Sequence, residues 1–129
     1  MSDLYEYFKI QHSYMLNSID KIIEINWYEL WFKTQDGIEY LYDAEDNVIK
    51  MLDTEVSLQD KARIKIAVLF RTLMSKHKLT QSGLGKRMGL SSTTINNYMK
   101  ASLIPSDYVM FKVSRTLGCG IDDLINWKF

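Results

Sequence analysis

The chain has 129 residues, 47% of them hydrophobic and 25% charged, which is the composition of a soluble globular protein. No stretch approaches the roughly 20 consecutive apolar residues of a membrane-spanning helix, and residues 1–11 do not have the pattern of a signal peptide. The single cysteine, Cys119, cannot form an internal disulfide and is expected to be a small buried residue. We therefore expect a cytoplasmic protein that does not contact membranes.

The net charge of zero conceals two oppositely charged halves. Residues 1–59 carry twelve acidic and four basic side chains, a net charge of −8, whereas residues 60–129 carry four acidic and twelve basic ones, a net charge of +8. A basic half often faces nucleic acid, although many basic surfaces are merely solvated. The acidic half is compatible with a counterweight to the basic half, with a surface for dimerisation or for a protein partner, or with no binding role.

Residues 1–56 predict a small acidic α+β module. A short helix is expected to begin at Ser2, which can cap it, and to run to about Leu16. A hairpin is expected at Asp36-Gly37, because glycine tolerates the positive φ that such a turn requires. Three or four antiparallel strands are expected, at residues 21–26, 29–34, 38–43 and 48–52.

Aromatic side chains are frequent in this module. We expect them to lie in the core or on a face of the sheet, and the alternative is a surface for a ligand or partner. They include Trp27, Trp31, Tyr40 and Tyr42.

From Ser57 the pattern changes to helix. Ser57 can cap a helix whose first turn carries Asp60, a favourable charge at the positive end of the helix dipole. Apolar residues then recur at helical spacing to about Lys76. Because the composition changes near residues 54–59, we expect one module over residues 1–56 and a second over residues 57–129.

Residues 79–100 have the pattern of two helices joined by a tight turn. Thr80 can cap a helix that ends at Met88, Gly89 supplies a left-handed residue, and Ser91 can cap a second helix that runs to about Lys100. An apolar set is expected to hold the two helices at a fixed angle: Leu84, Met88, Leu90, Ile95 and Tyr98.

The other side of the second helix is rich in short hydrogen-bonding side chains. Asparagine can pair bidentately with adenine, and serine or threonine can serve several bases, so this face suits the edges of DNA bases. An ordinary helical hairpin with a solvated polar face would show the same spacing. The outward residues are Ser92, Thr93, Asn96, Asn97 and Lys100.

The surrounding sequence distinguishes these alternatives. Residues 63–126 resemble the helix-turn-helix domains of Cro and phage repressors. The resemblance implies an all-α domain of five helices whose third helix lies in the major groove. It rests on Leu79-Thr80-Gln81, Leu84, Met88-Gly89-Leu90-Ser91, Ile95, Ile104-Pro105-Ser106, Leu117-Gly118 and Ile121-Asp122-Asp123-Leu124.

The resemblance also implies roles for individual residues. Gln81 matches the residue that opens the second helix and touches a backbone phosphate. Ser91, Ser92 and Thr93 match the start of the recognition helix, and Asn97 matches a position that reaches base edges. Further phosphate contacts are expected from Lys86, Arg87 and Lys100.

At three positions the sequence departs from the pattern of the family. Gly85 replaces the usual alanine, which should loosen the second helix by up to ~1 kcal/mol. Met99 replaces a common glutamate, and Ala101 replaces a common glycine after the recognition helix. These two changes leave the end of the third helix undefined.

These observations predict a sequence-specific regulator of transcription that binds double-stranded DNA, a repressor acting as a homodimer on a palindromic operator. The alternative is an antitoxin or a phage accessory or inhibitor protein, in which residues 1–56 bind a protein partner and DNA binding serves autoregulation. The sequence shows no nucleophile–base pair and no metal-ligand cluster at usable spacing. We therefore expect no catalytic residue, metal or cofactor.

Overall fold

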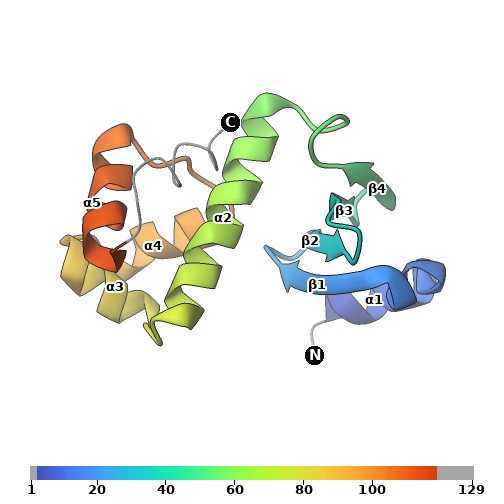
Figure 1. The fold of residues 1–129 in the computed structure, drawn as a ribbon, viewed down its shortest axis with the longest axis horizontal. Coiled ribbons are helices and arrows are strands. Elements are labelled where there is room, and N and C mark those ends of the chain that lie inside the picture. The colour runs from blue at the N-terminus through green and yellow to red at the C-terminus, as the bar shows by residue number, and fades with distance from the viewer. Residues whose placement is uncertain (1–2, 119–129) are drawn as a thin grey trace. The chain divides into compact units, whose positions relative to one another are not determined.

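The computed structural model describes residues 3–118, which form two compact units (Figure 1). The N-terminal unit is Met1–Ser57, and the C-terminal unit is Leu58–Phe129. Among the described residues, no helix is both long enough and apolar enough to cross a membrane.

The N-terminal unit consists of two short helices and a four-stranded antiparallel meander. The sheet has the order β1-β2-β3-β4, so each strand pairs with the next one along the chain. The predicted antiparallel strands are therefore confirmed. The elements are α1 (Asp3–Gln11), the 3-10 helix η1 (Ser13–Ser18), β1 (Ile19–Glu24), β2 (Glu29–Thr34), β3 (Glu39–Asp43) and β4 (Val48–Met51).

The first helix is shorter than the sequence predicted. It ends at Gln11, because His12 leaves the helical conformation with φ −133° and ψ 44°. The ring of His12 is hydrogen-bonded through Nδ1 to the Tyr14 hydroxyl and through Nε2 to Oδ1 of Asn47, at 3.0 Å each. A local bond to Tyr14 and a bond to the distant turn at Asn47 thus hold His12 where the helix ends.

The hairpin between β2 and β3 has the predicted glycine turn. Gly37 has φ +87°, and its N–H donates to the carbonyl of Thr34 at 2.9 Å. The Thr34 hydroxyl donates to the carboxylate of Asp36, and this bond to the ionised form lowers the pKa of Asp36 below its usual value. The turn is therefore fixed both by its backbone and by a side-chain bond.

Helix α1 packs on one face of the sheet through an aromatic core. Phe8 is fully buried, and its ring centroid lies 5.4 Å from that of Phe32 and 5.1 Å from that of Tyr42. Leu4 and Leu30 complete the cluster of buried residues. Burial of large aromatic rings in such contacts is the main stabilising contribution that a unit of this size has available.

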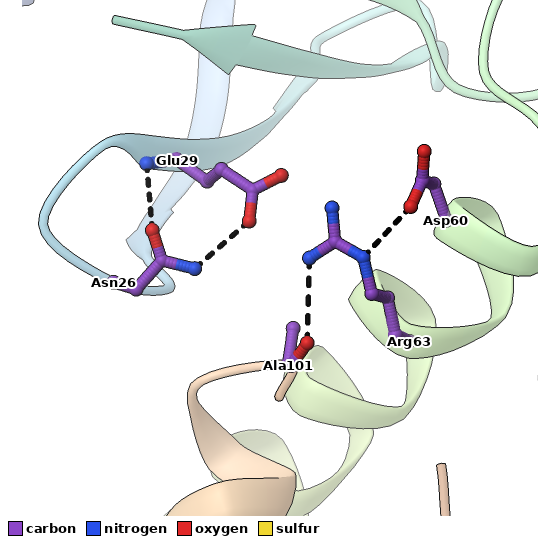
Figure 2. A network of polar contacts seen from close by, with 5 residues as sticks. All are labelled: Asn26, Glu29, Asp60, Arg63 and Ala101. Atoms are coloured by element: carbon purple, nitrogen blue, oxygen red, sulfur yellow. Dashed lines mark hydrogen bonds and ion pairs between the residues drawn. The ribbon is translucent and has the colours of Figure 1, made fainter. Parts of the chain in front are cut away.

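One aromatic residue departs from the expectation of a core or sheet position. Trp31 and Tyr42 are buried, and Tyr40 is half-buried and stacked on Phe32, but Trp27 is 73% exposed. Trp27 lies in the turn between β1 and β2, where Oδ1 of Asn26 accepts hydrogen bonds from the N–H groups of Tyr28 and Glu29. Figure 2 shows Asn26 bonded to Glu29. Trp27 contacts Tyr28 instead, with ring centroids 4.8 Å apart.

In the described part of the C-terminal unit, all regular structure is helical. One core joins the four helices, and its fully buried side chains include Ile66, Phe70, Leu84, Ile95 and Val113. The fifth helix that the resemblance implies, and Cys119, lie outside the described residues. The helices are α2 (Leu58–Lys76), α3 (Gln81–Met88), α4 (Ser92–Met99) and α5 (Asp107–Leu117).

Candidate nucleic-acid interface

Helices α3 and α4 are defined by their caps. The Thr80 hydroxyl accepts a hydrogen bond from the N–H of Gly83 at 3.0 Å, and the Ser91 hydroxyl accepts one from the N–H of Thr94 at 3.1 Å. Gly89 follows α3 in the left-handed conformation, with φ +68°. Each bond satisfies a donor that the first turn of a helix would otherwise leave unpaired. The predicted caps and the predicted turn residue are confirmed.

The angle between α3 and α4 is fixed by buried side chains. Leu84 and Ile95 are fully buried, and Met88 and Tyr98 are nearly so. Leu90, in the turn, packs against the same core and is half-buried. The apolar set predicted from the sequence is therefore the set that holds the two helices together.

Gly85 lies in α3 at the point where the turn that connects α3 to α4 packs against the helix. A Cβ atom built on this residue would lie 2.5 Å from the backbone carbonyl oxygen of Leu90. The N–H of Leu90 donates to the carbonyl of Gly85 at 2.8 Å, so the turn is hydrogen-bonded directly against the helix. The glycine thus does more than loosen α3, because it permits a close approach that alanine would obstruct.

The predicted DNA-contacting residues lie along one side of α4 and at the ends of α3. Ser92 and Thr93 are exposed in the first turn of α4, and Asn96, Asn97 and Lys100 are half-exposed further along. Ser91 is exposed as well, but its hydroxyl is already engaged with the N–H and hydroxyl of Thr94.

Gln81 and Asn96 connect the two helices. Nε2 of Gln81, the first residue of α3, donates to Oδ1 of Asn96 in the middle of α4 at 3.4 Å. Asn97 differs, because its side-chain amide has no hydrogen-bond partner within residues 3–118. Its donor and its acceptor are both available, as bidentate pairing with a base requires.

Some of the basic side chains in this unit have structural partners. Arg71 of α2 donates to the carbonyl of Met99 at 3.2 Å, and Lys112 of α5 donates to the carbonyl of Met88 at 3.2 Å. Arg63 donates to the carbonyl of Ala101 at 3.4 Å and also bonds Asp60 (Figure 2). Cations at these carbonyls neutralise the negative ends of α3 and α4. The bonds to these carbonyls join residues 24 to 38 positions apart, so no local sequence pattern indicates them.

Other basic side chains face outward. Lys86 and Arg87 are exposed in the last turn of α3. Residues 58–118 contain eleven basic and two acidic side chains, so that 11 − 2 gives a net charge of +9. A surface with this balance attracts a polyanion at long range, and the attraction is screened by salt.

Comparisons with known proteins find the same motif. A family model described as "Helix-turn-helix" matches residues 70–124, from the middle of α2 to beyond α5. The nucleoid occlusion protein of Bacillus cytotoxicus is 29% identical over 77 residues, which cover 60% of this chain and 26% of that protein. The chain therefore spans about a quarter of the length of this relative.

Two crystal structures of the clp gene regulator ClgR from Corynebacterium glutamicum are also similar. Their sequences are 15% and 14% identical, and each has a TM-score of 0.48 over 57% of this chain. The matches cover 91% and 73% of those chains.

The family match coincides with the two capped helices, the left-handed glycine between them and the apolar residues that fix their angle. Residues 70–124 match the family model described as helix-turn-helix, and within residues 70–118 the structure has the two capped helices and the tight turn of that motif.

Proposed function

We propose that the protein is a sequence-specific regulator of transcription that binds double-stranded DNA. The observation that carries this proposal is the capped α3–turn–α4 arrangement, whose apolar side is buried while short polar side chains of α4 remain exposed. Helix α4 is then the recognition helix in the major groove, and α3 crosses the DNA backbone.

The side chains divide between bases and phosphates. Asn97 reads a base edge, because its amide is available, and Ser92 and Thr93 contact bases near the start of α4. Gln81 touches a phosphate and is held by Asn96. The remaining phosphate contacts come from the basic side chains Lys86, Arg87 and Lys100.

We further propose that the protein is a repressor that acts as a homodimer on a palindromic operator. A single helix-turn-helix segment reads only a half-site, and two recognition helices about 34 Å apart reach successive major grooves. Occupancy of the operator is then sufficient for repression, without any chemical step.

Selection of bound sequences from a pool of random duplexes, with the purified full chain, tests this function. We expect enrichment of one motif with two inverted half-sites whose centres lie about one helical turn apart. Enrichment of a single half-site would remove the palindrome and the dimer from the proposal. Failure to enrich any motif would contradict sequence-specific binding.

A second candidate function is supported by the exposed side chains of the N-terminal unit. Trp27, Ile10 and Tyr14 are each more than 70% exposed, and large exposed aromatic and apolar residues are typical of interaction sites. The protein would then be an antitoxin or phage accessory protein that binds a protein partner through this unit. Co-expression with the product of a neighbouring gene tests this function. Copurification that is lost in Trp27→Ala, with unchanged affinity for DNA, would support it, whereas copurification unaffected by Trp27→Ala would exclude Trp27 as the anchor.

A further inference from the structure

The basic side chains of the C-terminal unit fall into two groups. Arg63, Arg71 and Lys112 donate to helix-end carbonyls, and Arg115 lies over the ring of Phe111. Three more, Lys61, Lys65 and Lys100, also have interactions within the protein. Among residues 58–118, the basic side chains with no such partner are Lys76, Lys78, Lys86 and Arg87.

These four residues are close together in the chain. Lys86 and Arg87 lie on α3, Lys76 is in the last turn of α2, and Lys78 lies in the corner between the two helices. All four are exposed. The cations that remain available to a ligand are therefore concentrated on α3 and the corner before it, while those elsewhere in the described unit are engaged.

Lys78 occupies a position that normally favours glycine. Its φ is +54°, and it closes α2 with the hydrogen bonds of a Schellman motif, from Lys78 N–H to the carbonyl of Ser75 and from Leu79 N–H to the carbonyl of Met74. A side chain in the left-handed conformation costs free energy that glycine avoids. Because Lys78 is exposed, its side chain recovers little of this cost by burial. Strained backbone positions of this kind gather at sites that bind ligands, so the charge of Lys78 is a candidate for such a contact.

Within residues 58–118, no acidic side chain is paired with this corner. Residues 58–118 contain only Asp60 and Asp107 as acidic residues, and Asp60 is paired with Arg63 near the opposite end of α2. Lys78 precedes Gln81 by three residues, so their Cα atoms lie within about 11 Å. The corner therefore adjoins the residue that the proposed function places on a phosphate.

We propose that Lys76 and Lys78 bind phosphates of duplex DNA, which extends the backbone contact of α3 along the same strand. This inference rests on the proposed function and adds a contact surface outside helices α3 and α4. The contacts are independent of base sequence, because they involve only the charge of the phosphate.

The test compares Lys76→Gln and Lys78→Gln in the full chain with a control, Lys61→Gln. The control removes the same charge near the other end of α2. The probe is a fluorescent duplex of mixed sequence, titrated at several salt concentrations. Each corner variant should bind more weakly and reduce the slope of log affinity against log salt by about one. Between ~50 and ~200 mM salt, the ratio of wild-type affinity to variant affinity should therefore fall about three- to fourfold for each lysine replaced. Lys61→Gln should retain the wild-type slope.

Lys78→Gly separates the contact from an effect on folding. This variant should unfold at a higher temperature than the wild type and still bind DNA more weakly. Wild-type slopes in both corner variants, with a reduced slope in Lys86→Gln, would overturn the inference and leave the proposed function intact. Absence of DNA binding by the folded wild-type chain would instead overturn the proposed function.

Discussion

Glycine has two different tasks in the helix-turn-helix segment. Gly89 has φ +68° and open space around the position of its missing Cβ, so its task is conformational. Gly85 lies within α3, and its task is steric, because a Cβ would lie 2.5 Å from the carbonyl oxygen of Leu90. Helix propensity alone favours alanine over glycine at position 85, but the close approach of the Leu90 carbonyl leaves no room for a Cβ atom.

We therefore expect Gly85→Ala to destabilise the protein by about 1–3 kcal/mol, the usual cost of overpacking, even though alanine favours helix by up to ~1 kcal/mol. Ser82→Ala, an exposed position in the same helix, is the control and should be nearly neutral. Chemical unfolding measures both variants. A Gly85→Ala protein as stable as the wild type would show that the turn can move away at little cost.

Ala101 ends α4 in the left-handed backbone conformation that usually favours glycine. It stands where glycine is common, and its φ is +62°. The N–H of Ser102, which follows it, donates to the carbonyl of Asn97 at 2.9 Å and closes α4. The backbone thus adopts the left-handed conformation that glycine would favour, and this defines the end of α4, which the sequence had left open.

At the scale of the elements, the caps and the apolar spacing determined what could be predicted. Thr80, Ser91 and Gly89 act within a few residues of their own positions, so local sequence is sufficient to identify them. The bonds of Arg71 and Lys112 join helices that are distant in sequence, and no local pattern records them. The exposure of Trp27 was missed for a different reason, because alternation of apolar and polar residues predicts strands better than it predicts the geometry of a turn.

Helix α4 offers a test of base contact against phosphate contact. If Asn97 reads a base, Asn97→Ala should cost ~1–3 kcal/mol on the selected site and relax preference at one position. If Lys100 touches a phosphate, Lys100→Ala should weaken all sequences alike and reduce the salt slope by about one. Binding to the selected site and to single-base variants measures both effects. An Asn97→Ala protein with unchanged affinity and preference would show that the assignment is wrong.

Substitution of Lys112 tests whether the basic residues that bond helix-end carbonyls stabilise the fold. Its amine bonds the carbonyl of Met88, the last residue of α3, and lies 5.0 Å from the ring centroid of Tyr108. Lys112→Met keeps most of the apolar stem and removes the charge, so we expect a loss of about 1 kcal/mol in the free energy of unfolding. The slope of DNA affinity against salt should stay the same. A reduced slope with unchanged stability would instead place Lys112 among the phosphate contacts.

At the scale of the whole molecule, the proposed homodimer requires a surface that holds two helix-turn-helix segments together. We propose that the N-terminal unit pairs two chains, because a small unit buries a limited share of its apolar surface, and because Ile10, Tyr14 and Trp27 remain exposed here. Its net charge of −8 over residues 1–57 opposes this pairing, so apolar contact must prevail locally.

Sedimentation of the full chain and of residues 57–129 tests this arrangement. We expect a dimer for the full chain at tens of micromolar and a monomer for the fragment, because the fragment lacks the pairing surface. Dimerisation of the fragment to the same extent would assign the pairing to the C-terminal unit. A monomeric full chain would favour the partner-binding role of the N-terminal unit.

The measurement that tests the central claim most directly is the affinity of the purified full chain for duplex DNA as a function of salt, with its fold checked by circular dichroism. The available cations on α3 and in the corner before it predict that log affinity falls linearly with log salt, by about 0.9 for each phosphate that is neutralised. A folded, helical protein that binds no duplex DNA even at ~50 mM salt, where such contacts are strong, would contradict the account.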